Sequence, residues 1–108
     1  MTVQVLLVSF KFNISHPEYT QIIKPLVDYI LNTPGLRWKI WLINESQCTA
    51  GGVYLFDDAC YVQEFLASPL MSRLEHHPAF SNFWAMPFDV LESETAITHG
   101  PIGKGARV

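Results

Sequence analysis

Three side chains in the middle of the sequence could hold the oxygen atoms of a small molecule. Trp41 offers an indole N–H, Asn44 an amide and Tyr54 a phenolic hydroxyl, and each lies in or beside a mostly apolar segment. In a pocket that excludes water, such groups could orient a bound oxygen and relay a proton. They are our candidate catalytic residues. For Trp41 and Tyr54 the alternative is packing at a subunit interface, and for Asn44 we favour the capping of a turn.

Arg37 and Lys39 are the cations closest to these candidates. Both alternate with Trp41, and residues two apart in a strand share one face. Their charge could therefore lower the pKa of an acidic hydroxyl bound beside Trp41. The alternative, which we favour, is that both charges protect an exposed edge strand from pairing with other chains. Trp38, on the other face, is expected to pack under the helices.

Other kinds of reactive site find little support in the sequence. The four histidines are scattered and no set of Asp, Glu or His has the spacing of metal ligands; His77 is a minor candidate for a catalytic base. No Ser or Cys lies in a nucleophile motif, and Gly51-Gly52 lies in a predicted strand, unlike a phosphate-binding loop. Cys48 and Cys60 are expected to be reduced thiols. We expect neither a metal nor a nucleotide cofactor.

The composition indicates one globular domain. The 108 residues are 49% hydrophobic and 16% charged, with a net charge of −3. Nucleic acid and anionic membranes are disfavoured as partners, because both require clustered cations. The apolar runs are too short to span a bilayer and no signal peptide is evident, so we expect a cytoplasmic protein.

Apolar periodicity predicts four strands and two main helices. The strands are expected at residues 3–12, 36–44, 50–56 and within 79–91, and the helices at residues 15–32 and 58–68, with a further short helix at 70–77. Ser15 and Glu18 have the spacing of a capping box, and Pro25 is expected to kink the first helix. Gly51-Gly52 suggests a bulge or a close backbone approach.

The order β-α-β-β-α-β predicts an α+β ferredoxin-like sandwich. With right-handed crossovers, four strands form an antiparallel sheet and both helices cover one of its faces. Residues 1–92 would make this domain, and residues 93–108 an extended tail.

The predicted strands are apolar on both faces. In the first strand, for example, Val5 and Leu7 alternate with Leu6 and Val8. Because two helices cover only one face, the other apolar face predicts a partner, most simply a second copy packed face to face about a two-fold axis. The two sheets would enclose a pocket. Its substrate-binding candidates are Phe10, Phe56, Trp84, Met86, Phe88, Arg37 and Lys39.

Two segments resemble the signature of a known family. Residues 34–41 read PGLRWKIW and residues 50–56 read AGGVYLF, which is similar to the PG-x-x-WK-x-W…AGG-[IV]-YLF pattern of the YdhR-like monooxygenases. Residues 24–26 and 88–90 also match, and the resemblance extends from about residue 3 to residue 98. It implies a dimeric α+β barrel.

The resemblance also implies a reaction. The family is grouped with cofactor-independent monooxygenases that oxidise polycyclic phenols to quinones, so the implied partners are an aromatic phenol and dioxygen, with no cofactor. The ionised phenol must then supply the electron to dioxygen, and the protein must accept or share its proton. The alternative is a non-catalytic ligand-binding or dimeric interaction module. Heme is disfavoured, because no histidine falls clearly on the predicted sheet face.

Overall fold

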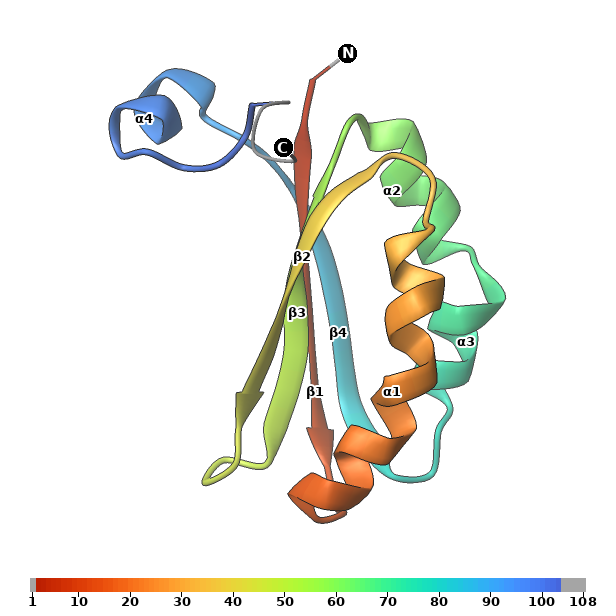
Figure 1. The fold of residues 1–108 in the computed structure, drawn as a ribbon. Helices are drawn as coiled ribbons and strands as arrows, with labels where there is room; N and C mark the ends of the chain where they lie inside the picture. Colours follow the sequence, from red (N-terminus) through yellow and green to blue (C-terminus); the bar gives the residue numbers. More distant parts are fainter. Residues whose placement is uncertain (1, 104–108) are drawn as a thin grey trace.

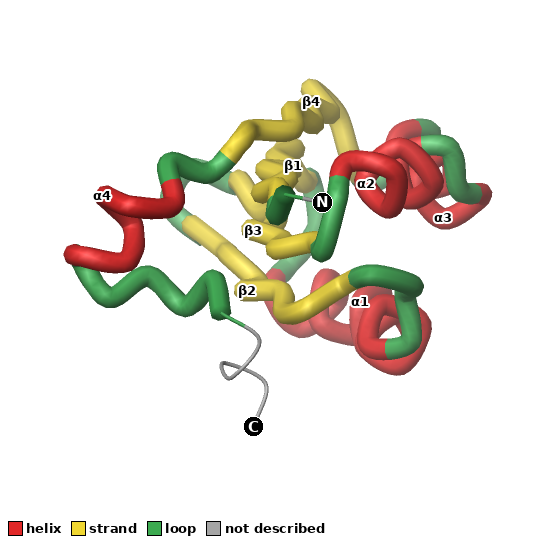
Figure 2. The backbone as a smooth tube through the Cα atoms, turned by 90° about the horizontal axis from the view of Figure 1, so that it is seen from above, coloured by secondary structure: helices red, strands yellow, loops and turns green. Residues whose placement is uncertain are grey.

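The computed structural model describes residues 2–103 and shows a four-stranded sheet with helices on both sides. The elements are β1 (Gln4–Phe12), α1 (His16–Leu31), β2 (Leu36–Asn44), β3 (Thr49–Phe56), α2 (Ala59–Leu66), α3 (Pro69–Glu75), β4 (Phe80–Asp89) and α4 (Glu92–Ile97). The strands pair antiparallel in the order β2-β3-β1-β4. α1, α2 and α3 cover one face, and α4 lies on the other side (Figures 1 and 2). This confirms the ferredoxin-like prediction.

The start of α1 is fixed by the predicted capping box. The Glu18 backbone N–H donates to the Ser15 hydroxyl at 3.2 Å, and the Ser15 N–H donates to the Glu18 carboxylate at 3.1 Å. Both amides would otherwise lack partners at the helix end. These two contacts lower the pKa of the Glu18 carboxyl, and the hydrogen bond from the backbone has the larger effect. α1 continues through Pro25 to Leu31.

We expect Ser15→Ala to destabilise the protein by about 1 kcal/mol, because it leaves the N3 amide of α1 without its acceptor. Urea denaturation measures the change. Ser72→Ala in α3 is the matched control, since the Ser72 hydroxyl makes no hydrogen bond within residues 2–103. Equal losses in both variants would contradict a capping role for Ser15.

Gly51 and Gly52 allow a close approach of neighbouring groups, one of the two alternatives expected. A Cβ at Gly51 would lie 1.9 Å from the Val8 carbonyl oxygen, and one at Gly52 would lie 2.6 Å from Lys39 Cε. The irregularities of register fall elsewhere, between Ser9 and Lys11 and between Leu36 and Trp38. Gly51 therefore lets β1 approach β3, and Gly52 leaves space for the lysine side chain.

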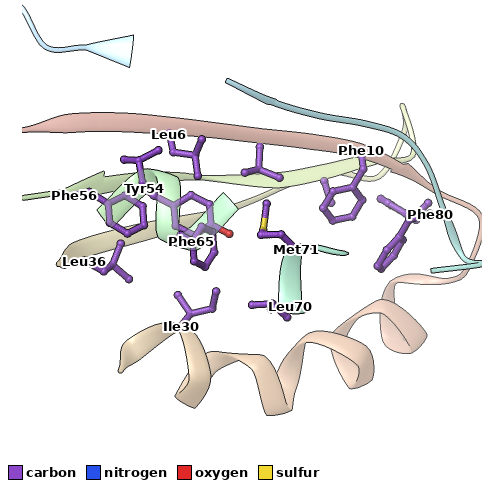
Figure 3. Packing of buried hydrophobic residues seen from close by; sticks show 14 of the residues in the cluster. Leu6, Phe10, Ile30, Leu36, Tyr54, Phe56, Phe65, Leu70, Met71 and Phe80 are labelled. Carbon is purple, nitrogen blue, oxygen red and sulfur yellow. The ribbon is translucent and has the colours of Figure 1, made fainter. Parts of the chain in front are cut away.

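The hydrophobic core lies between the sheet and the three covering helices. Figure 3 shows side chains of the sheet directed toward α1 and α3. β1 contributes Leu6 and Phe10, and β3 contributes Tyr54 and Phe56, all of them buried. Tyr54 and Phe65 have ring centroids 5.1 Å apart, a typical distance for a favourable aromatic pair. The side chains on this face of the sheet are thus buried against the helices.

The second face is also apolar and stays partly exposed. Strand register places Ile40, Val53, Leu7 and Met86 in one row across it, from β2 to β4. The two residues at the ends of this row are 51% and 41% exposed. We call the side of the sheet that carries this row the open face. A wholly apolar row on an open face agrees with the strand pattern seen in the sequence.

The C-terminal segment crosses one end of the open face. Where the sequence suggested an extended tail, residues 92–97 form α4, and the chain then returns to β2. The Trp38 indole N–H donates to the Pro101 carbonyl at 2.8 Å, and Arg37 donates to the Ile102 carbonyl at 2.5 Å. The expectation for Trp38 is therefore wrong: its neighbour in β3 is Leu55, on the face opposite α1. Positions 104–108 of the predicted tail lie outside the described residues.

Candidate functional site

A lysine and two aromatic rings form a cluster on the helix-covered face of the sheet. In the β2–β3 register, Lys39 lies opposite Tyr54 and Trp41 opposite Gly52. Lys39 Nζ lies 3.3 Å from the centroid of the Trp41 ring and 4.5 Å from that of Tyr54. The missing side chain at Gly52 makes room for this arrangement. We call Lys39, Trp41 and Tyr54 the lysine–aromatic cluster.

Burial changes the proton affinities in this cluster. It lowers the pKa of Lys39 to about 7. It raises the pKa of Tyr54 well above the ordinary range, with a smaller contribution from Tyr19, and it raises the pKa of Tyr19 to about 12. The aromatic faces favour the ammonium form and oppose part of the effect on the lysine. Lys39 is thus the member of the cluster that exchanges a proton near neutral pH, while both tyrosines stay neutral.

Three small cavities lie around the cluster, between α1 and β2. The innermost has about 20 Å³, space for one water. Toward the surface lie cavities of about 140 Å³ and about 90 Å³. Trp41 lines all three, and Lys39 lines the innermost one and the 140 Å³ cavity. These two side chains therefore separate the interior space from the rim.

The 140 Å³ cavity has the size of one aromatic ring, since an apolar cavity of about 150 Å³ binds benzene in another protein. Its lining is aliphatic on the α1 side and includes Lys39 and Trp41 of the cluster on the β2 side. The lining residues are Val27, Ile30, Leu31, Leu36, Arg37, Trp38, Lys39 and Trp41. An aromatic ligand seated here would reach the lysine amine from the strand side.

Two larger hollows lie away from the cluster. One of about 560 Å³ lies between α1 and α2 and is bordered by Asp28, Tyr29, Tyr61 and Glu64. The other, of about 460 Å³, lies between the open face and the α4 segment. Neither is lined by Lys39, Trp41 or Tyr54. Size alone thus does not identify the reactive site here.

The structure divides the predicted pocket lining between the two faces of the sheet. Phe10 and Phe56 lie in the core with Tyr54, whereas Trp84, Met86 and Phe88 lie on the open face, each 41% exposed. A single pocket lined by all of them between two sheets is therefore a wrong expectation. The reason is register: Leu6, on the helix side, pairs with Tyr54, and the partners of Val5 and Leu7 in β4 are Phe88 and Met86.

Asn44 and Arg37 have structural partners. The Asn44 side-chain oxygen accepts from the Ser46 hydroxyl at 3.0 Å and from the Gln47 N–H at 3.2 Å, so the turn-capping alternative is confirmed. Arg37 Nε lies 2.5 Å from Asp57 Oδ1, and the same guanidinium holds the C-terminal segment. β2 is an edge strand, as predicted, but Arg37 serves as a clamp rather than as a guard along that edge.

The histidines divide between turns and the rim of the site. His77 Nδ1 accepts from the Ala79 N–H at 3.0 Å, and its ring packs against Phe80, so it belongs to the turn before β4. His16 lines the 90 Å³ cavity and lies 3.0 Å from Glu45. Within residues 2–103, no group of three or more His, Cys, Asp or Glu could hold a metal ion.

Tyr19 is the site residue that sequence reasoning missed. In the sequence it begins an apolar stripe of the first helix that continues through Ile22, Ile23 and Leu26, and in the structure it lines both the 20 Å³ and the 90 Å³ cavities. The available signal was a tyrosine among aliphatic residues, because the hydroxyl of a buried tyrosine usually has a hydrogen-bond partner.

Comparison with known protein families shows which family this chain belongs to. Residues 5–101 match the family described as "Putative mono-oxygenase ydhR". The chain belongs to this family. The PGLRWKIW and AGGVYLF segments, residues 34–41 and 50–56, lie mostly in β2 and β3 and contain the whole lysine–aromatic cluster. No protein of curated function is detectably similar in sequence.

Solved structures share the fold at low sequence identity. A mutant of SnoaB, a cofactor-independent oxygenase from Streptomyces nogalater, superposes with a TM-score of 0.67 at 13% identity, over 84% of this chain and 95% of SnoaB. The heme degrader MhuD from Mycobacterium tuberculosis gives 0.63 at 15% identity, over 82% and 95%. A hydroxynitrile lyase from Passiflora edulis gives 0.64 at 16% identity, over 84% and 95%. Proteins with this fold thus catalyse different reactions, so the function of this protein has to be inferred from the residues of its site.

None of the helices within residues 2–103 has the length and apolarity needed to cross a membrane.

Proposed function

We propose that this protein is a cofactor-independent monooxygenase that oxidises an aromatic or polycyclic phenol with dioxygen. The observation that carries the proposal is the lysine–aromatic cluster: an amine of lowered pKa held against two aromatic rings, beside a ring-sized cavity, in a member of a mono-oxygenase family. An aromatic substrate and a proton-exchanging group are what this chemistry requires.

The reaction balances without a cofactor. A naphthol and one dioxygen molecule give a naphthoquinone and one water, so one oxygen atom enters the ring and the other leaves as water. The protein binds the ring, excludes water and handles the phenolic proton. Trp41 offers its indole N–H and neutral Tyr54 its hydroxyl as donors to the substrate oxygen, the roles expected from their types.

We further propose that the protein is a homodimer through the open face. Support comes from the apolar row across that face and from its partial exposure. Two copies packed about a two-fold axis would bury Trp84, Met86 and Phe88, which makes these three residues interface candidates rather than lining of the reactive site. A cytoplasmic location remains a prediction.

Oxygen uptake tests the activity. Chelator-treated protein, shown by its absorption spectrum to hold no flavin or heme, is mixed with 1-naphthol and with anthracene-1,8,9-triol. We expect protein-dependent consumption of one dioxygen per quinone formed. The Trp41→Phe, Tyr54→Phe double variant should lose most of this rate, and unchanged turnover would remove the site assignment.

The second candidate is a non-catalytic binding module. The small innermost cavity favours it, because about 20 Å³ cannot hold a ring unless Trp41 or α1 moves. Calorimetric binding of both phenols without oxygen uptake would support the module and contradict the oxygenase.

A further inference from the structure

We propose that the side-chain amine of Lys39 is the proton acceptor for the phenol, which enters from the 140 Å³ cavity between α1 and the β2 edge. This inference rests on the proposed function and assigns one catalytic residue within it. It reverses the role suggested by the sequence, in which the lysine served only as a positive charge.

The position of the amine supports this role. Lys39 extends from β2 toward the helices and lines both the 140 Å³ cavity and the innermost one, so its side chain borders the outer space and the inner one. The faces of Trp41 and Tyr54 hold it in place. A ring in the outer cavity would lie against aliphatic side chains of α1, with its hydroxyl directed inward to the amine. No other nitrogen base of the described part of the chain lines both cavities.

Within residues 2–103, the charged and titratable neighbours leave this amine without a counter-ion. The groups facing it are Tyr54 from β3, Tyr19 from α1 and Arg37 from β2. Both tyrosines are neutral at pH 7, and the guanidinium of Arg37 is engaged by Asp57 and the Ile102 carbonyl. Among the residues that the structure describes, none that carries a carboxylate lines either cavity. Burial without a counter-ion favours the neutral amine, which is the form that accepts a proton.

The step is a single proton transfer. The O–H bond of the phenol breaks, a bond forms between that proton and Nζ of Lys39, and the products are a phenolate and an ammonium. The phenolate then supplies an electron to dioxygen, the co-reactant of the proposed reaction. The new ammonium lies over the Trp41 ring and beside the phenolate, and both stabilise it. The proton leaves with the water that the reaction forms.

Arginine distinguishes a base from a charge. Lys39→Arg keeps a positive charge but cannot accept a proton near neutral pH. If the lysine accepts the proton, Lys39→Arg and Lys39→Met should both lose roughly 100-fold or more in kcat for 1-naphthol, the usual contribution of a general base. The wild-type rate should rise with pH through about 7, and both variants should lose this rise. Lys24→Met, an exposed lysine on α1, is the control and should keep the wild-type rate.

A rate within threefold of wild type in Lys39→Arg would overturn the proposal in favour of a charge role. Circular dichroism and urea denaturation of each variant show that the loss is not one of folding.

A measurement without turnover separates this proposal from the oxygenase itself. Under argon at pH 7.5, 2-naphthol is added to protein labelled with ¹⁵N at its lysines, and the Lys39 signal is identified by its absence in Lys39→Met. We expect the Lys39 nitrogen to change from amine to ammonium, with the absorption of bound naphtholate. An unchanged Lys39 signal with neutral bound naphthol would overturn the proposal. Ionisation without later oxygen uptake would leave the acceptor in place and contradict only the oxygenase.

Discussion

The Ile40→Lys, Met86→Lys double variant should sediment as a monomer, whereas the wild-type protein should sediment as the proposed dimer. These residues lie at the two ends of the apolar row on the open face. A dimer packed through this face about a two-fold axis would therefore bury four new charges, two from each copy. Each buried charge without a partner costs several kcal/mol, so the dissociation constant should rise at least about 1,000-fold. Sedimentation equilibrium at micromolar concentration measures it.

The control for this experiment places a charge on an apolar residue of the other layer. Leu31 in α1 is 69% exposed and faces away from the open side, so Leu31→Lys should stay dimeric. A wild-type protein that sediments as a monomer would contradict the dimer, as would a double variant that sediments like the wild type.

Lys39→Met should stabilise the fold while it removes activity. The amine is largely buried, and no carboxylate of residues 2–103 lines its cavities; the lowering of its pKa from 10.5 to about 7 corresponds to a folding cost of roughly 4–5 kcal/mol, of which the contact with the two rings offsets about 1–2 kcal/mol. Methionine fills a similar volume against the two rings. Urea denaturation at pH 7 should therefore show a gain of about the difference between these two energies. A loss of stability would mean that the cation–aromatic contact outweighs the cost of burial.

The stability difference between Lys39→Met and wild type should also change with pH in a defined direction. The folded-state pKa of Lys39 is lowered to about 7, from 10.5 in the unfolded chain, so between these values the unfolded chain binds one proton more. The cost is full below pH 7 and declines as pH rises toward 10.5. The advantage of Lys39→Met over wild type should therefore shrink between pH 7 and pH 9.5, whereas Lys24→Met should run parallel to wild type. A constant advantage would contradict the lowered pKa.

Local patterns in the sequence predicted most of the fold. The Ser15 and Glu18 pair predicted the start of α1, because a capping box depends only on residues three apart. Pro34-Gly35 and the apolar run after them predicted β2 at its observed bounds. Apolar residues on both faces of β1 predicted the uncovered apolar side of the sheet. Each of these features is written within a few neighbouring residues.

The faces of the sheet could not be predicted in the same way. Whether Trp38 or Trp41 faces the helices depends on how β2 is registered against β3, and a shift of one residue exchanges the two faces. The sequence placed the two tryptophans correctly on opposite faces but assigned Trp38 to the helices. The same ambiguity put Tyr54 and Met86 into one pocket. The return of the C-terminal segment to Arg37 is a long-range contact that no local pattern shows.

The site of ligand binding tests the central claim most directly. A crystal structure with 2-naphthol, grown and soaked without oxygen, would show where the phenol binds. We predict the ring between α1 and β2, against Trp41, with its hydroxyl within hydrogen-bonding distance of the Lys39 amine. A ring bound between the open faces of two copies, or in the hollow between α1 and α2, would contradict the account.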